Sequence, residues 1–507
     1  MFGNVLSAVI LGVDTHKVMV EADISAGLPG FSIVGVSSAQ GREAQERVRT
    51  ALRNAGIHLP PRKITVNLAP AALKKTGAGF DLPVAAAVLC AAEYIPPDAL
   101  RDILVIGELG LDGQVRRGNG VLPAVLMAKE HHCKACIVPA ANQAEARCVE
   151  GIRVIGIDHL SQLLEFCRRG EVPPQHPESL KKAADRQLDF SEVRGQNLAK
   201  RGALLAAAGF HNLLMTGPPG SGKTMIARRI PGILPRMTPK EKMEVMKILS
   251  IAGLWDGEDE QNLRRPFRAP HHSLSLPALT GGGRIPRPGE VTLAHRGVLF
   301  LDELAEVSRN VLESLRQPLE EQKIVLSRLS GDYTFPADFL FVAAANACPC
   351  GAYPDMNRCV CTQAQIDRYR ARLSQPLLER IDLCVQTVSV DWASLQETKS
   401  HKRETARMKE QVERARRMQK KRYGDHGFLC NSRLSGEETR RYCELSDKAE
   451  KLLEASYRRL ELSVRVCHRV IRVARTAADL DGSEKIEEKH LREALFFRGM
   501  DQRDWKA

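Results

Sequence analysis

The sequence predicts a multidomain α/β protein, and three observations predict this class. A glycine-rich turn at 217–224 joins a short apolar run to a helical segment. Two later apolar runs, 297–301 and 339–345, each end in polar residues, as buried parallel strands do at the ligand-binding edge of an open α/β sheet. The region 396–507 is charged and helical, so a helical domain should follow the α/β core.

The first 170 residues alternate strand-like and helical segments. The runs 17–22 and 63–67 have the spacing of strands, and 39–55 has that of a helix. A polar, proline-containing link follows at 171–189. The length of 507 residues suffices for about three domains with separate cores. We therefore expect an α+β domain at 1–170, a linker at 171–189, an α/β core at 190–395 and a helical domain at 396–507.

The glycine-rich turn fits the pattern G-x-x-x-x-G-K-[ST] at every fixed position. It follows the apolar run 212–215 and leads into the helical segment 225–230, which is the context in which this pattern binds phosphates. Its backbone N–H groups and the helix N-terminus attract an anion. We expect Lys223 to neutralise the β- and γ-phosphates and Thr224 to bind Mg²⁺.

Two further strands should bring acidic and amide side chains to the same edge. The strand at 297–301 leads directly into Asp302 and Glu303. Asp302 is expected to hold Mg²⁺, and Glu303 to orient and deprotonate the attacking water. Asn346 follows the third strand and could position the same water, or simply begin a turn. The predicted nucleotide-binding residues are Gly217, Pro218, Pro219, Gly220, Ser221, Gly222, Lys223, Thr224 and Asp302.

Two arginines complete this set. Arg380 lies between apolar residues in Leu-Leu-Glu-Arg, and Arg465 follows Ser463 at the start of a helix. An arginine near a γ-phosphate stabilises the charge of the transition state. The ordered motifs resemble those of AAA+ ATPases. The phrases at 267–272, 281–283, 288–290, 293–295 and 348–351 more closely resemble the magnesium-chelatase-like branch of the ComM type, along nearly the whole chain.

The resemblance implies a fold, two cofactors and an assembly. It implies an AAA+ core that uses ATP and Mg²⁺ and assembles as a homo-oligomeric, hexameric ring. Arg380 would then reach into the neighbouring subunit's site, and Arg465 would sense the γ-phosphate from a helical lid. The phrases 107–115 and 137–139 make the first domain resemble the S5-type fold of Lon-type proteases. Gly79 and Leu122 stand where those proteases carry their serine and lysine, so we expect a domain without proteolytic activity.

The charge distribution and two segments of the core suggest a DNA partner. The net charge is +13, and 399–422 carries 11 basic and 3 acidic residues, which fits either a solvated helical face or a polyanion-binding surface. In this branch of AAA+ proteins, insertions such as 264–296 point into a central pore. A hairpin is expected near 323–336. The candidate DNA contacts, expected to be mainly to phosphates, are Arg264, Arg265, Arg268, Lys323 and Arg328.

Cysteine and histidine pairs raise the question of metal binding. Cys348, Cys350, Cys359 and Cys361 match a tetrahedral Zn²⁺ site in number and type, although reduced thiols or a labile disulfide are alternatives. For the adjacent His271 and His272, structural hydrogen bonding is the simpler interpretation. The 13 dispersed cysteines, together with the lack of a long apolar run or a signal peptide, favour a cytoplasmic protein without a membrane segment.

Three functional classes follow from these observations. The preferred one is a ring-forming ATPase that couples hydrolysis to DNA translocation, as in helicase action or branch migration during recombination or natural transformation. The alternative is a chelatase-type ATPase subunit that remodels a metal-insertion partner. The third, an ATP-dependent protease, is disfavoured because the serine–lysine pair is missing.

Overall fold

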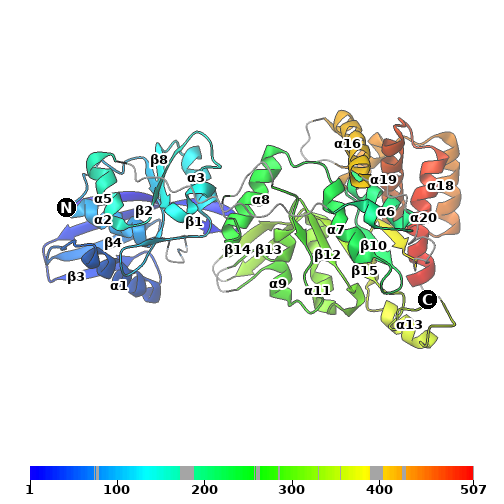
Figure 1. Ribbon diagram of the computed structural model, residues 1–507, viewed down its shortest axis with the longest axis horizontal. Coiled ribbons are helices and arrows are strands. Elements are labelled where there is room, and N and C mark those ends of the chain that lie inside the picture. The colour runs from blue at the N-terminus through cyan, green and yellow to red at the C-terminus, as the bar shows by residue number, and fades with distance from the viewer. Residues whose placement is uncertain are drawn as a thin grey trace.

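A computed structural model shows three parts that follow one another along the chain (Figure 1). It describes residues 1–73, 75, 79–96, 98–171, 188–255, 257, 263–283, 286–328, 331–353, 355–388, 403–424 and 430–505. The blue and cyan N-terminal domain lies at one end, the green core is central, and the orange and red helices lie at the other end (Figure 1). Most of the expected linker falls outside the described residues. None of the helices in these ranges is long and apolar enough to span a bilayer.

The N-terminal domain is built on a seven-stranded sheet in the order β3-β4-β2-β1-β5-β8-β9. The central strands β1 and β2 pair antiparallel, with Val5 opposite Val20. The expected strands at 17–22 and 63–67 and the helix at 39–55 are confirmed. The strands are β1 (Phe2–Leu11), β2 (Asp14–Ser25), β3 (Gly30–Val34), β4 (Lys63–Ala69), β5 (Ile103–Val105), β8 (Ala135–Pro139) and β9 (Arg153–Ile157), beside the small ribbon β6 (Glu108–Leu109) and β7 (Val115–Arg116). The helices are α1 (Ser38–Asn54), α2 (Asp81–Ala91), α3 (Val121–Glu130), α4 (Gln143–Ala146) and α5 (Leu160–Arg169).

The core holds a parallel five-stranded sheet in the order β11-β12-β15-β10-β16. Its three central strands are buried on both faces, which explains why they are continuous apolar runs rather than alternating ones. Strand β10, which precedes the phosphate loop, lies between β15 and β16. The strands are β10 (Leu213–Thr216), β11 (Phe267–Arg268), β12 (Val298–Leu301), β15 (Leu340–Ala345) and β16 (Leu383–Gln386).

Helices and a hairpin surround this sheet. The expected hairpin is confirmed as β13 (Lys323–Arg328) paired with β14 (Gly331–Pro336). The helices are α6 (Asn197–Gly209), α7 (Lys223–Ile233), α8 (Pro239–Ala252), α9 (Leu276–Thr280), α10 (Glu290–Leu293), α11 (Arg309–Ser314), α12 (Arg316–Glu321), α13 (Gln363–Arg370) and α14 (Gln375–Leu378).

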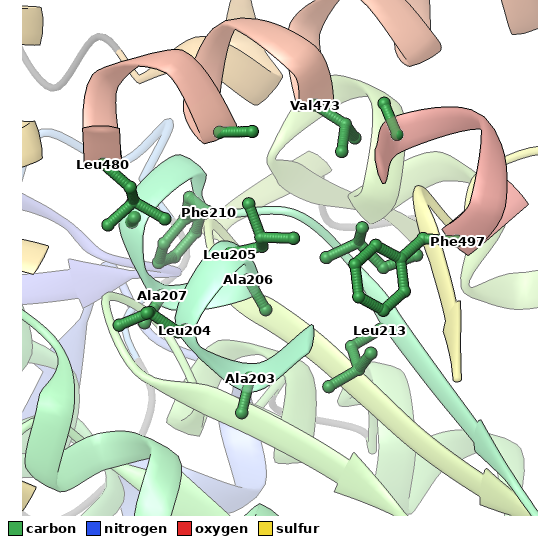
Figure 2. Packing of buried hydrophobic residues seen from close by; sticks show 14 of the residues in the cluster. Ala203, Leu204, Leu205, Ala206, Ala207, Phe210, Leu213, Val473, Leu480 and Phe497 are labelled. Atoms are coloured by element: carbon green, nitrogen blue, oxygen red, sulfur yellow. The ribbon is translucent and has the colours of Figure 1, made fainter. Parts of the chain in front are cut away.

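The C-terminal helices close over the core along one continuous apolar cluster. Figure 2 shows Leu205 of α6, and Phe210 just after this helix, on the side toward Val473 and Leu480, with Phe497 beside Leu213 of the sheet. An ion pair between Arg201 and Glu493, with a shortest distance of 2.6 Å, adds to this contact. The helices are α16 (Glu404–Tyr423), α17 (Gly436–Tyr442), α18 (Asp447–Arg459), α19 (Val464–Asp481) and α20 (Glu488–Trp505).

The N-terminal domain packs directly on α8 of the core. Met246 and Trp255 belong to the same buried cluster as residues of α3 and β8. The Gly120 N–H donates to the Ser250 carbonyl over 3.0 Å. The turn at Gly12, between β1 and β2, also meets Thr334 of the hairpin. The two α/β parts therefore share a packed interface.

The expected insertion at 264–296 begins later than its sequence suggests. Phe267 and Arg268 form β11, which pairs with β12 as the edge strand of the core sheet. The excursion from the core is therefore the segment 269–289, which contains the short helix α9. The bidentate contact of Arg268 with Glu290, at 2.6 and 2.7 Å, closes its base. The local pattern could not reveal β11, because a two-residue strand carries almost no periodic signal.

Candidate functional site

The phosphate loop is held between the ends of β10 and β16. Gly217 has φ +156°, and a Cβ built there would lie 2.2 Å from the Thr387 hydroxyl oxygen, so only glycine fits. The Ser221 and Thr387 hydroxyl oxygens are 2.7 Å apart. Gly222 has φ +88° and precedes Lys223, the first residue of α7. The loop therefore ends where the helix N-terminus favours an anion.

Lys223 lies inside this loop. Its Nζ donates to the carbonyls of Gly217 and Pro218, at 2.7 and 2.9 Å, and to Asn346 Oδ1 at 3.3 Å. Burial lowers the pKa of the Lys223 ammonium, while Asp302 opposes the shift. A desolvated cation on carbonyl acceptors is well suited to a phosphate, which offers it full charge compensation.

The two acids that follow the expected strand, Asp302 and Glu303, lie close to Thr224. The Thr224 hydroxyl donates to Asp302 Oδ2 over 2.7 Å, and Asp302 Oδ1 accepts the Glu303 N–H at 3.0 Å. A hydroxyl and a carboxylate oxygen side by side are hard ligands of the kind Mg²⁺ prefers. Glu303 has φ +49°, an uncommon conformation for this residue, and its half-exposed carboxylate lies 3.1 Å from His272 Nδ1.

Five residues predicted from separate motifs therefore form one site. Lys223 and Thr224 follow β10, Asp302 and Glu303 follow β12, and Asn346 follows β15. The sheet brings them together because the carboxyl ends of parallel strands meet at one edge. The contact between His272 and Glu303 was missed. Its only sequence signal was the adjacent pair of histidines.

The two expected arginines lie together at Glu320 and not at the phosphate loop. Arg380 is 6% exposed, and its guanidinium contacts Glu320 and the Pro376 carbonyl. Arg465, largely exposed, lies 3.7 Å from the same carboxylate. Among the described contacts of this single chain, neither arginine reaches the phosphate loop. The role expected of Arg380 in a neighbouring subunit's site, and that expected of Arg465 as a sensor of γ-phosphate, therefore stay predictions; for either role the contact with Glu320 would have to be exchanged for the phosphate.

The four cysteines after Asn346 converge. The Sγ atoms of Cys348, Cys350 and Cys359 are 3.4 to 3.8 Å apart, and all four sulfurs lie within 4.8 Å of one another. A tetrahedral Zn²⁺ with Zn–S bonds of about 2.3 Å places its sulfurs about 3.8 Å apart. The donor set and its spacing therefore fit zinc. All 13 cysteines of the chain are free of disulfides.

The cysteine loop also touches the phosphate loop. Gly351 has φ +79°, and a Cβ built there would lie 2.5 Å from the Pro219 ring. A cavity of about 650 Å³ lies between these loops and is lined by Gly217, Cys350 and Thr387, among others. The cysteine loop thus contacts one side of the nucleotide site and follows Asn346 directly.

The expected DNA contacts divide into two groups. Arg265 is buried, binds Glu241 at 3.2 Å and donates to two backbone carbonyls, so its position does not support a DNA contact. Arg268 is held by Glu290. Arg264 is exposed, as are Lys323 and Arg328 on the hairpin. The Arg328 guanidinium would lie 3.6 Å from a Cβ built on Gly282, which places the hairpin beside the glycine-rich part of the excursion.

The positions expected for proteolytic residues hold no reactive group. Gly79 lies before α2, and no atom of the described residues lies within 4 Å of a Cβ built on it. Leu122 is fully buried near the start of α3. Its N–H donates to Glu145 at 3.1 Å. Neither position can supply a nucleophile or a base.

Three family models match the chain, and each is described as subunit ChlI of magnesium chelatase. They cover 20–142, 189–395 and, for the C-terminal part of that subunit, 402–498. Competence protein ComM of Haemophilus influenzae is 42% identical over 505 residues, which cover 98% of this chain and 97% of the relative.

Two other relatives extend this picture. The uncharacterized protein YifB of Escherichia coli is 41% identical over 494 residues, 97% of this chain and 96% of its own length. Lon protease 2 of Bacillus subtilis is 30% identical over 142 residues, 28% of this chain and 25% of its own length. With matches along both α/β parts and the helical domain, the chain belongs to the magnesium chelatase ChlI family of AAA ATPases and is a homologue of ComM and YifB.

Proposed function

We propose that this protein is a ring-forming ATPase that couples ATP hydrolysis to movement along DNA, as a helicase or branch-migration motor. The observation that carries the ATPase part is the convergence of Lys223, Thr224, Asp302, Glu303 and Asn346 at one edge of the sheet. Each has a distinct task there. Lys223 neutralises the phosphates, Thr224 and Asp302 hold Mg²⁺, and Glu303 activates water that Asn346 helps to position.

The ring part of the proposal rests on the two arginines. A phosphoryl-transfer site needs positive charge opposite the phosphate loop. Arg380 and Arg465 have suitable chemistry, but both meet at Glu320 in the single chain. A second copy that presents this pair to the nucleotide would complete the site. The hexameric number is proposed from the family alone.

The DNA part rests on two basic surfaces. Lys323 and Arg328 on the hairpin lie beside the excursion. On α16 and the residue that caps its N-terminus, one exposed face carries cations at helical spacing, with Glu410 as the exposed acid among them. Those cations are Arg403, Arg407, Arg414, Arg417, Lys420 and Lys421. Such surfaces bind phosphates without reading sequence.

The ATPase rate of the purified protein, measured without DNA and with duplex, single-stranded or forked DNA, tests this proposal. We expect at least one DNA form to stimulate turnover, with a response that weakens as salt rises. In the competing chelatase-type function, ATP hydrolysis responds to a protein partner. A rate that is indifferent to every DNA form, together with no salt-sensitive DNA binding, would favour that alternative.

A further inference from the structure

One carboxylate joins the three parts of the chain that carry the phosphate loop and the two expected arginines. Asp382 lies two positions after Arg380. Its Oδ2 accepts the Asn212 N–H at 3.1 Å, and its Oδ1 accepts a hydrogen bond from the Arg469 guanidinium at 3.2 Å. Asn212 lies 170 positions earlier and Arg469 lies 87 positions later, so both contacts are created by the fold.

Asn212 ties this carboxylate to the strand that leads into the phosphate loop. It directly precedes β10, and its carbonyl accepts the Asp382 N–H at 3.0 Å. The Asn212 side chain donates from Nδ2 to the Arg380 carbonyl at 2.9 Å and accepts the Phe341 N–H of β15 at 3.1 Å. The backbone of 380–382 is therefore held against two central strands of the sheet.

Arg469 ties the same carboxylate to the helical domain. It lies one helical turn after Arg465 on α19, so both side chains project from one face of that helix. The side chains of Arg469 and Asp382 are 16% and 10% exposed. Burial alone would raise the pKa of the Asp382 carboxyl, but Arg469 and the neighbouring His211 hold that pKa below its ordinary value. Removal of either partner of such a pair leaves an uncompensated buried charge, so the contact resists separation.

The Arg380 side chain is held less firmly than its backbone. Its guanidinium contacts the Pro376 carbonyl and Glu320, whose side chain is 45% exposed. A contact with an exposed carboxylate is weak, because water competes for it. By contrast, Arg498 of α20 donates to the Ile381 carbonyl and adds a second tie between this backbone and the helical domain. The guanidinium of Arg380 can therefore change partner while its backbone stays in place.

We propose that Asp382 is a positioning residue for both arginines. It keeps Arg380 at a fixed place relative to the strand of the chain's own phosphate loop. Through Arg469, it keeps the helix that carries Arg465 in the same frame. An arginine stabilises the charge of a transition state only when it is held where that charge develops. The described contacts of the Asp382 carboxylate include no residue of the phosphate site, so it acts through the residues that it holds. This inference rests on the proposed role of Arg380 across a subunit boundary.

The test uses full-length chains in which one partner of this contact is changed. Asp382→Asn keeps the shape of the side chain and removes its charge, and Arg469→Gln removes the guanidinium from α19. Glu404→Gln is the control, since Glu404 pairs with Lys200 at 2.8 Å between the helical domain and the core, and both side chains are 14% exposed. We expect Asp382→Asn and Arg469→Gln to lower turnover about ten- to a hundredfold, with a smaller effect on the KM for ATP. Glu404→Gln should stay near the wild type.

Mixing with other inactive chains shows which part of the site Asp382 serves. The Asp382→Asn chain keeps its phosphate loop, so it should regain turnover with Lys223→Ala, which supplies a well-placed arginine. With Arg380→Ala it should gain nothing, because no interface then receives such an arginine. Recovery with Arg380→Ala, recovery with neither chain, or wild-type turnover of Asp382→Asn by itself would overturn the inference.

A reference mixture of Lys223→Ala with Arg380→Ala separates the two levels of the argument. If differently tagged chains form mixed rings and this mixture stays inactive, the proposed role of Arg380 across the boundary fails, and the inference fails with it. If the reference mixture recovers turnover and Asp382→Asn does not behave as Arg380→Ala does, only the inference fails.

Discussion

Lys223 and Glu303 act at different stages of the proposed reaction, although they lie in one site. Lys223 meets phosphates that are already charged in bound ATP, whereas Glu303 acts on water. Loss of a contact that is already made in bound ATP weakens nucleotide binding. Loss of a contact that is made only in the transition state slows hydrolysis and leaves substrate binding intact. Substitution of the two residues should therefore give distinct defects.

We predict that Lys223→Ala abolishes nucleotide binding, while Glu303→Gln binds ATP and loses about a hundredfold or more in turnover. Binding of a fluorescent ATP analogue and single-turnover hydrolysis measure the two effects separately. Normal turnover in Glu303→Gln would remove this residue from the catalytic role. Normal nucleotide affinity in Lys223→Ala would remove Lys223 from the phosphate site.

At the residue scale, the sequence predicted best those side chains whose partners are fixed by a motif. Lys223 and Thr224 follow from one loop, and Asp302 and Asn346 follow from where apolar strands end. Arg265 could not be assigned this way. Arg265 lies outside any helix and pairs with Glu241 of α8, and nothing next to Arg265 in sequence signals that contact. The same holds for Glu320, which lies 60 positions from Arg380 and yet binds it.

At the element scale, the loop 347–361 joins a metal-binding arrangement to the nucleotide site. Asn346 lies two positions before Cys348, and Gly351 approaches Pro219 of the phosphate loop so closely that a Cβ would not fit between them. A bound metal would fix this loop by linking four side chains through one ion. The four-cysteine spacing was readable from sequence. The contact with Pro219 was not, because it depends on how two loops meet above the sheet.

We predict one Zn²⁺ per chain, bound by Cys348, Cys350, Cys359 and Cys361. Cys359→Ser should lower the metal content to near zero, whereas Cys467→Ser, which changes a cysteine outside the cluster, should leave it unchanged. Mass-spectrometric metal analysis of carefully purified protein gives the readout. A metal content near zero in the wild-type protein contradicts the assignment.

The hairpin β13–β14 is the element in which a DNA contact is most easily tested. Lys323 and Arg328 are exposed on it, and the N-terminal domain supports its opposite strand near Thr334. If both cations neutralise phosphates, replacing both by alanine should reduce the log–log salt slope of duplex binding by about 2.

Two exposed cations on α18, Lys451 and Arg459, provide a charge-matched control. Their replacement by alanine changes the net charge equally but should leave the slope near that of the wild type. Fluorescence anisotropy over a salt series measures both variants. Equal slopes for the hairpin variant and the wild type would exclude the hairpin as a phosphate contact.

At the scale of the whole molecule, the proposed role of Arg380 depends on an assembly of several chains. Arg380 is almost completely buried against Glu320, and the nucleotide residues lie at the carboxyl edge of the sheet. If Arg380 completes a neighbour's site, then an intact loop and an intact arginine can come from different chains. A mixed ring would contain such interfaces even when each chain alone is inactive.

We predict that mixing Arg380→Ala with Lys223→Ala chains restores part of the ATPase activity that each lacks. Turnover is followed across mixing ratios, and mixed assembly is verified by differently tagged chains. Rings that contain both chains but remain inactive would exclude a role for Arg380 across the interface.

The larger architecture was predictable because each part has its own pattern: alternation in the first domain, buried runs in the core and helical spacing at the end. The packing of the first domain on α8 was not, because it joins Trp255 and Met246 to residues more than a hundred positions earlier. This interface connects the N-terminal domain to the helix that precedes β11 and the excursion.

The most direct test of the central claim is ATP-dependent displacement of a labelled strand from a three-way branched DNA. We predict that the wild-type protein displaces the strand only when it can hydrolyse ATP, and that Glu303→Gln binds the same DNA without displacing it. Vigorous ATP hydrolysis by the wild type with no displacement from any branched substrate would contradict DNA translocation, as would displacement by Glu303→Gln at the wild-type rate.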